Sequence, residues 1–132
     1  MGTKQGRFNE SYFRKKLSAA EYHILRQKGT EPPFSGRYLY CDESGTYYCR
    51  ACGQRLFSSR HKCQSGSGWP SFNKALSGAV QIRPDFRHFM IRREVLCRRC
   101  GSHLGHLFYD GFCVPDIRYC INSAALKFRK GK

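Results

Sequence analysis

The spacing of apolar side chains divides the chain into a short helical start and a longer stretch of strands. Between residues 9 and 28, apolar positions return at intervals close to one helical turn. The positions that we expect to face the core are Tyr12, Phe13, Leu17, Tyr22 and Leu25. Ser18 and Glu21 have the spacing of a capping box, in which each side chain accepts a hydrogen bond from the other residue's amide. The pattern predicts a helical arm in two pieces that ends before Gly29.

Beyond the Pro-Pro pair at residues 32–33, the pattern changes to short apolar runs bounded by glycine, proline and polar residues, which is typical of strands. We expect strands at residues 37–41, 46–49, 79–83, 89–96, 104–108, 118–121 and 126–128. The first two would form a hairpin across residues 42–45, and the fourth would place alternate residues from Phe89 to Val95 on one face. The sequence therefore predicts a mainly β, mostly antiparallel domain that carries an N-terminal helical arm.

Length and composition fit one domain. The chain has 132 residues, of which 40% are hydrophobic, enough for one core but too few residues for two domains. We expect residues 9–128 to form the domain, with a flexible basic N-terminus at residues 1–8 and a basic tail at residues 129–132. No apolar run approaches the ~20 residues of a membrane helix, so we expect no membrane partner. Because the first residues have no apolar signal core, the expected location is cytoplasmic. A mitochondrial or endoplasmic reticulum location stays open for a chain whose targeting segment was removed.

The chain is strongly basic, with 24 Lys and Arg residues against 9 Asp and Glu and a net charge of +15. Such a field attracts polyanions in general. The basic residues are spread along the chain and are not interleaved with aromatic residues, as a base-stacking surface would require. We therefore expect a solvated basic surface and no nucleic-acid partner. The competing class of function is a zinc-ribbon-type module that binds nucleic acid or acidic protein, which clusters such as residues 14–16 keep open.

Four of the eight cysteines form two CxxC pairs that indicate a metal site. These are Cys49 with Cys52 and Cys97 with Cys100, each preceded by an expected strand and followed by a glycine. Two such pairs complete a tetrahedral shell of four thiolates, which is typical of structural zinc with no open coordination position. The sequence predicts one structural zinc ion per chain. Two disulfides, free cysteines, or His103 or His106 in place of one cysteine are the alternatives.

Among the other four cysteines, Cys120 has the neighbours of a reactive thiol. Arg118 and Asn122 lie two residues away on either side, so the three side chains share one face of a strand. A guanidinium group favours the thiolate, which is the nucleophilic form. The remaining three are Cys41, Cys63 and Cys113, and a lone cysteine is ordinarily a small buried hydrophobe.

Further candidate groups lie nearby in the sequence. His103, His106 and Asp110 offer two imidazoles and a carboxylate, and a nucleophilic cysteine commonly acts with a histidine that a third group orients. Each histidine could equally be structural, and Asp110 could open the Asp110-Gly111 turn. Trp69, in a glycine-rich segment, could present its indole face to a sulfur-linked methyl group or be a core aromatic.

Together these segments resemble the type B methionine sulfoxide reductase family (MsrB), in the same order and with similar spacing over roughly residues 9 to 128. The matching segments are residues 29–36 (GTEPPFSG), both CxxC pairs, residues 66–72 (GSGWPSF), His103-Leu-Gly-His106 with Asp110-Gly111, and residues 118–128 (RYCINSAALKF). The resemblance implies two twisted antiparallel sheets of the MsrB type with a four-cysteine zinc site. It also implies reduction of the R epimer of methionine sulfoxide, in oxidised proteins or free, by a redox-active cysteine.

The resemblance also implies roles for individual residues. Cys120 matches the catalytic cysteine, which attacks the sulfoxide sulfur and becomes a sulfenic acid. Trp69 matches the indole that packs on the substrate's S-methyl group. The residues that match those binding or protonating the sulfoxide oxygen, or orienting the water and thiolate, are His103, His106, Asp110, Arg118 and Asn122.

The sequence departs from the family's commonest pattern at Ser67, where many members carry a cysteine that resolves the sulfenic acid as a disulfide. Serine cannot do so. The candidates for a resolving thiol in this chain are Cys63 and Cys113, ranked equal, followed by Cys41. Direct attack by an external thiol such as thioredoxin is the alternative.

Overall fold

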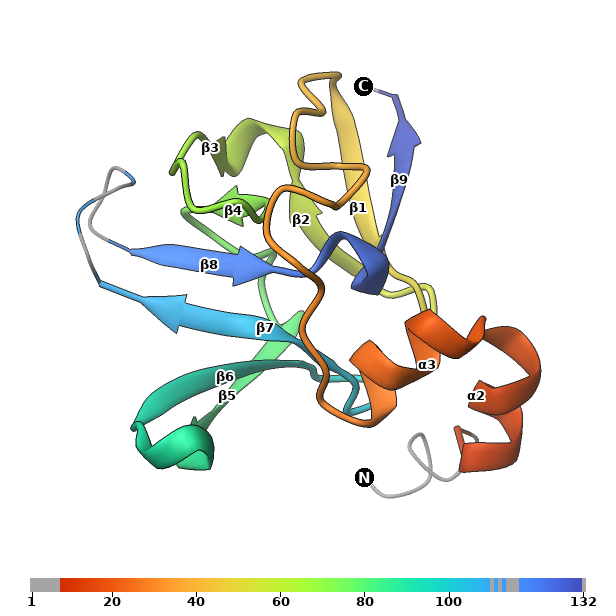
Figure 1. The fold of residues 1–132 in the computed structure, drawn as a ribbon. Helices are drawn as coiled ribbons and strands as arrows, with labels where there is room; N and C mark the ends of the chain where they lie inside the picture. The colour runs from red at the N-terminus through yellow and green to blue at the C-terminus, as the bar shows by residue number, and fades with distance from the viewer. Residues whose placement is uncertain (1–7, 110, 112, 114–116, 132) are drawn as a thin grey trace.

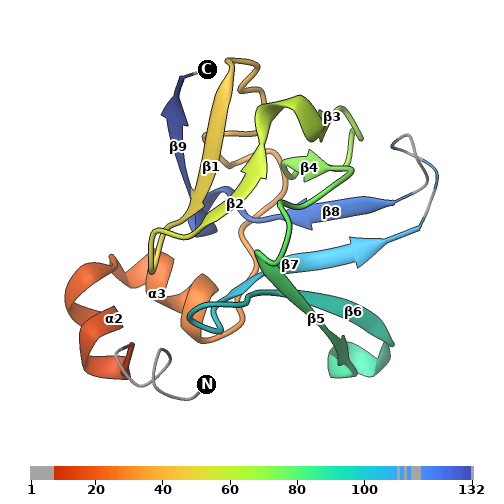
Figure 2. The same ribbon diagram turned by 180° about the vertical axis from the view of Figure 1, so that it is seen from behind.

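The computed structural model describes residues 8–109, 111, 113 and 117–131. Within them the chain forms two antiparallel sheets with two short helices at one end (Figures 1 and 2). The three-stranded sheet has the order β2 (Arg55–Ser58), β1 (Gly45–Cys49), β9 (Leu126–Lys130). The six-stranded sheet has the order β3 (Lys62–Cys63), β4 (Ser71–Phe72), β8 (Arg118–Ile121), β7 (His103–Phe108), β6 (Arg92–Cys97), β5 (Val80–Asp85). The expected mainly β architecture of two antiparallel sheets is confirmed.

The expected helical arm is present as α2 (Glu10–Lys16) and α3 (Ala19–Arg26). The Ser18 side chain accepts from the Glu21 amide at 3.1 Å, and the Glu21 carboxylate accepts from the Ser18 amide at 3.0 Å, so the capping box is formed. Phe13 and Leu25 are fully buried, and this burial holds the short helices against the sheets, since helices of this length are marginal alone.

Aromatic rings join the two sheets. Phe57 of β2 stacks on Phe72 of β4 with ring centroids 4.4 Å apart, and Tyr47 of β1 contacts Phe72 edge-on at 5.1 Å. All three residues have no exposed surface. Burying each such ring contributes about 1.5–3 kcal/mol, so this cluster fixes the three-stranded sheet onto the strands that carry the site.

The expected hairpin between residues 37–41 and 46–49 is wrong. Residues 37–40 form turns, in which the Leu39 amide bonds the Gly36 carbonyl and the Cys41 amide bonds the Tyr38 carbonyl. The two edges of β1 are already occupied by β2 and β9. A strand at residues 37–41 would therefore have no place beside β1.

The expected strand at residues 89–96 begins only at Arg92. Residues 87–89 form a 3-10 turn, η2 (Arg87–Phe89), and Phe89 is fully exposed with a left-handed φ of 58°. The turn forms because the Arg87 amide and guanidinium both donate to Asp85, which bends the chain at the end of β5. Short strands β2, β3 and β4 were not expected, because runs of two to four residues carry no readable period.

Residues near both ends of the described chain belong to the fold. Residues 1–7 lie outside the described residues, and Phe8 packs on the rings of Tyr12 and Phe13. At the other end β9 continues to Lys130, two residues into the expected tail. In the described ranges, no helix has the length and apolar character needed to span a membrane.

Candidate active site and metal centre

The two CxxC pairs lie together. Their four sulfur atoms are all within 4.8 Å of one another. Each pair follows a strand, β1 or β6, and turns back through a glycine with positive φ, Gly53 at 85° and Gly101 at 77°. The Gly53 amide donates to the Cys49 carbonyl, and the Gly101 amide donates to the Cys97 carbonyl, both at 2.8 Å. The sequence therefore builds two matching turns that aim four thiols at one point.

The donor set fits a tetrahedral metal ion. Sulfur atoms placed ~2.3 Å from a central zinc lie about 3.8 Å apart, and the Cys49–Cys100 and Cys52–Cys97 sulfur pairs are separated by 3.8 Å and 3.6 Å. The four cysteines form no disulfide. The hydrogen bond with Cys49 lowers the pKa of the Cys100 thiol, and the same contact raises the pKa of Cys49. The alternatives of two disulfides or a histidine ligand are wrong.

A separate cavity of about 140 Å³ lies over the centre of the six-stranded sheet. Cys120 is half-buried in its wall. The other lining residues come from the strands β6, β7 and β8 and from three connecting segments: Thr30, Ser67, Trp69, Arg92, Gly105, His106, Phe108, Arg118 and Asn122. Of the residues singled out from the sequence, Cys120, His106, Arg118, Asn122 and Trp69 therefore meet in one place, whereas His103 is not in the cavity wall.

Strand register places His106 beside Cys120. The two residues are direct partners in the β7–β8 pair, so their side chains project from the same face at adjacent positions. Gly105, the preceding residue in β7, lets the two strands approach closely at this point, because a Cβ atom there would collide with the Cys120 carbonyl. An imidazole close to the Cys120 sulfur thus follows from this register.

A β-bulge brings the second histidine to the same face. Val95 pairs with Gly105 and Leu96 pairs with His103, so Leu104 is an extra residue in β7. Without it, residues three apart on a strand would point to opposite faces. The Leu104 carbonyl, displaced from the ladder by the bulge, accepts from the amide of Asn122 and from its Nδ2, both at 3.0 Å.

Buried carboxylates hold both imidazoles. Asp85 Oδ2 lies 2.7 Å from His106 Nε2, and Glu94 Oε2 lies 2.7 Å from His103 Nδ1. The Arg87 guanidinium, which bonds both oxygens of Asp85, holds the pKa of that carboxyl far below its usual range. Since an ionised carboxylate accepts only, His106 Nε2 donates to Asp85 and Nδ1 is the atom left to exchange a proton.

The two imidazoles differ in their surroundings: His106 lines the cavity, whereas His103 is buried behind it. Burial lowers the pKa of His106 although the hydrogen bond to Asp85 opposes this, so His106 is neutral at neutral pH and acidic once protonated. Burial raises the pKa of Glu94, but the His103 hydrogen bond and nearby charges outweigh it, and the net direction is downward. His103 is 1% exposed, and its Nε2 has no hydrogen-bond partner among the described residues. The His103 ring contacts the His106 ring edge-on at 5.4 Å and supports it from behind.

Glu31 ties the remaining parts of the site together. Its carboxylate accepts from the Ser123 and Ala124 amides at 2.8 and 3.0 Å, at the start of η3 (Ser123–Ala125). Its carbonyl accepts from Trp69 Nε1 at 2.9 Å, and its amide donates to Asn122 Oδ1 at 2.9 Å. One buried residue thereby fixes the edge of the indole and the orientation of the Asn122 amide. The indole is left to face the cavity.

The sequence did not single out Glu31, Asp85, Glu94 or Arg92 as functional. The first three are buried, with 7%, 5% and 2% of their surface exposed. Arg92 lines the cavity and lies 3.8 Å from Asp85. The available signal was the scarcity of acidic residues: the chain has only 9, and three of them lie around this one site. Asp110, the other predicted residue, lies outside the described residues.

The candidate resolving cysteines are bonded to each other. Cys63 of β3 and Cys113 form a disulfide with their Cα atoms 5.9 Å apart. Ser67 occupies the cavity wall instead, with its hydroxyl bonded to Ser65 at 2.8 Å. Cys41 lies apart, in the wall of another depression together with Lys62.

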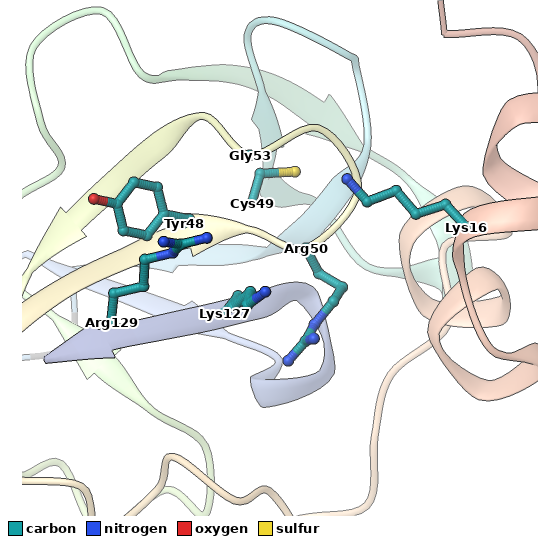
Figure 3. Close-up of a pocket in the computed structure, with 7 residues that line it drawn as sticks. All are labelled: Lys16, Tyr48, Cys49, Arg50, Gly53, Lys127 and Arg129. Carbon is teal, nitrogen blue, oxygen red and sulfur yellow. The ribbon is translucent and has the colours of Figure 1, made fainter.

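A larger, basic cavity of about 300 Å³ lies on the outer side of the three-stranded sheet (Figure 3). Four cationic side chains approach it, Lys16 from α2, Arg50 from the first CxxC turn, and Lys127 and Arg129 from β9. Tyr48, Cys49 and Gly53 complete its wall. Cys49 belongs to the four-thiol cluster, so this cavity offers charge but no free sulfur.

Comparisons with known proteins agree with this geometry. A sequence model of the SelR domain matches residues 17–130. A protein of Methanosarcina barkeri named peptide methionine sulfoxide reductase MsrB is 52% identical over 130 residues, covering 98% of this chain and 92% of that protein. A protein of the same name from Acinetobacter baylyi is 50% identical over 121 residues, covering 91% and 87%.

A solved structure with a similar fold is the Mis18 "Yippee-like" domain. It aligns with a TM-score of 0.56 and 15% identity, over 68% of this chain and 99% of that one. Likeness at this level of identity concerns the fold alone.

Proposed function

Because the chain belongs to the MsrB family of SelR-domain proteins, which are methionine sulfoxide reductases, we propose that it reduces methionine-R-sulfoxide through attack by the Cys120 thiolate. The observation that carries this proposal is the pairing of Cys120 with His106 in the wall of one cavity. A sulfur nucleophile and a proton donor side by side are what transfer of an oxygen atom from sulfoxide to thiol requires.

The reaction begins when the Cys120 sulfur donates an electron pair to the sulfoxide sulfur. The sulfoxide oxygen gains negative charge and takes a proton from His106, which stabilises the transition state. The oxygen ends on Cys120 as a sulfenic acid, and methionine leaves with its sulfur lone pair restored. Cys120 is thereby oxidised by two electrons and the substrate is reduced by two.

His106 is the acid in this proposal, and His103 positions it. His106 lines the cavity, whereas His103 is buried behind it with one nitrogen held by Glu94. The lowered pKa of His106 makes its protonated form a readier donor. Asp85 maintains the tautomer in which Nδ1 takes up the proton.

The substrate's methyl group is proposed to pack on Trp69, whose edge Glu31 fixes by a hydrogen bond. Sulfur-linked groups pack favourably on aromatic rings. Arg118 and Arg92, also in the wall, supply positive charge toward which the sulfoxide oxygen can point. Asn122 acts as a positioning residue because both ends of its amide are bonded to backbone.

We propose that zinc is the ion of the four-thiol cluster, one per chain. When bound it supplies a closed structural cross-link between the turns after β1 and β6. The substrates are oxidised proteins or free methionine-R-sulfoxide, and an external thiol such as thioredoxin completes the cycle.

Replacement of Cys120 tests the proposal. Cys120→Ser should abolish methionine formation from a methionine-R-sulfoxide substrate while the circular dichroism spectrum stays unchanged. Cys41→Ser, which alters a free cysteine away from the cavity, is the matched control and should retain full activity. Retained activity in Cys120→Ser would overturn the mechanism.

A further inference from the structure

We propose that Cys63 and Cys113 form a second dithiol that takes over the oxidation from Cys120, so that one reduced chain converts two molecules of methionine-R-sulfoxide before any external thiol acts. The inference rests on the proposed function of Cys120. It begins from two facts: Ser67 in the cavity wall cannot resolve a sulfenic acid, and the fold brings Cys63 and Cys113 into a disulfide.

Strand register places the disulfide on the same face as the reacting sulfur. Cys63 pairs with Ser71, and Ser71 pairs with Cys120, across the neighbouring strands β3, β4 and β8 (Figure 1). Directly opposed residues of antiparallel strands project to the same side. The sulfur atoms of Cys63 and Cys120 therefore lie above one face, separated by the small side chain of Ser71.

Strand spacing argues against direct attack by Cys63 and leaves the attack to its disulfide partner, Cys113. Cys63 and Cys120 are two strand spacings apart, about 10 Å, whereas a disulfide requires Cα atoms within about 7 Å. Cys63 therefore does not attack Cys120 directly. Cys113, which precedes Cys120 by seven residues in the sequence, is the thiol assigned to that attack.

The exchange balances in two steps. The Cys113 thiolate attacks the Cys120 sulfenic acid, a Cys113–Cys120 disulfide forms, and the hydroxyl group leaves as water with one proton. The Cys63 thiolate then attacks the Cys113 sulfur and displaces the Cys120 thiolate. Two electrons from the Cys63–Cys113 dithiol thus restore Cys120, and the Cys63–Cys113 disulfide is the product.

The exposure of Cys63 and Cys113 indicates which of the two an external thiol attacks when it reduces their disulfide. Cys113 is buried, with 3% of its surface exposed, whereas Cys63 is half-buried on β3, the edge strand of the six-stranded sheet. An external thiolate therefore reaches Cys63 first and releases Cys113. This places the docking of the reductant at the sheet edge, away from the substrate cavity.

The yield of methionine without reductant tests the inference. Fully reduced protein, freed of reductant, is mixed with excess methionine-R-sulfoxide and quenched, and methionine per chain is counted. Two equivalents are expected, with Cys63–Cys113 found as a disulfide by peptide mapping. Protein whose Cys63–Cys113 bond is formed beforehand should yield one equivalent, a comparison that needs no substitution.

Variants identify the steps. Cys113→Ser should yield one equivalent and leave a sulfenic acid on Cys120, and Cys63→Ser should yield one and accumulate the Cys113–Cys120 disulfide. Cys41→Ser should still yield two. One equivalent from fully reduced wild-type protein, with Cys63 and Cys113 still free thiols, would overturn the relay and leave the proposed function intact. No methionine at all would instead remove the proposed function.

Discussion

Cys49 and Cys120 each lie in the wall of a cavity, but the two sulfur atoms face different surroundings. Cys49 is 1% exposed, and its sulfur lies 3.8 Å from that of Cys100 within a closed group of four thiols. Cys120 is half-buried with an imidazole directly across the strand pair. A cysteine becomes structural or reactive according to which groups its sulfur meets.

The size and charge of a cavity do not indicate which of the two cysteines, Cys49 or Cys120, has the surroundings of a reactive thiol. The basic cavity beside Cys49 has about twice the volume of the one beside Cys120, and four cations approach it (Figure 3). The smaller cavity has an oriented histidine, an indole and a sulfur with open space. Placement of unlike groups around one sulfur is therefore the better indicator of chemistry.

The largest effect is expected from breaking the closed thiol group. Cys97→Ser should lose the metal and the fold together, because metal binding to such a site contributes about 10 kcal/mol or more, as much as the whole stability of a domain. Metal analysis and circular dichroism measure this. A well-folded, metal-free Cys97→Ser protein would show that the fold, and with it the Cys120 cavity, does not depend on the four-thiol cluster. Cys41→Ser is the control and should keep both the metal and the fold.

Removal of the imidazole beside Cys120 should have the next largest effect. His106→Asn should lower kcat/KM by about 10²- to 10⁴-fold, the usual contribution of a general acid, and leave the metal content unchanged. His103→Asn should have a smaller effect on kcat/KM, since in the proposed mechanism His103 contacts the His106 ring and transfers no proton itself. Steady-state kinetics of both variants measure this, and the reverse order would assign the acid to His103.

A smaller change is expected when the carboxylate behind His106 is neutralised. The hydrogen bond to Asp85 raises the pKa of His106 against the effect of burial. His106 must be protonated to act as the acid, so activity falls as pH rises through its pKa. Asp85→Asn should move this descending limb of the kcat/KM profile to lower pH, because the hydrogen bond that raises the pKa of His106 is lost. If the descending limb of the Asp85→Asn profile stayed at the wild-type pH, Asp85 would not influence the proton transfer.

The parts of the fold and the candidate site that involve neighbouring residues could be predicted from the sequence. The parts that depend on residues far apart in the chain could not. The capping box at Ser18 and the two CxxC turns involve residues at most four apart, so their geometry follows from spacing alone. The bulge at Leu104 depends on how β7 pairs with β6. Glu31 meets Asn122, Ser123 and Ala124 across 91 to 93 residues, and no local pattern marks a carboxylate that will bind two distant amides.

The smallest effect is expected in the basic cavity. Lys127→Glu removes one of its four cations at an exposed strand position, where substitutions ordinarily change stability by less than about 0.5 kcal/mol. Thermal unfolding and kcat/KM should both stay close to wild type. A marked loss of activity toward methionine-R-sulfoxide would mean that this cavity contributes to the reaction.

Trapping the oxidised sulfur tests the central claim most directly. Protein with Cys113→Ser, which holds the oxidation where it first forms, is given one equivalent of methionine-R-sulfoxide in the presence of dimedone, and the labelled peptide is identified by mass spectrometry. The account predicts one label on Cys120 for each methionine released. Methionine release with the label on another cysteine, or with none, would contradict it.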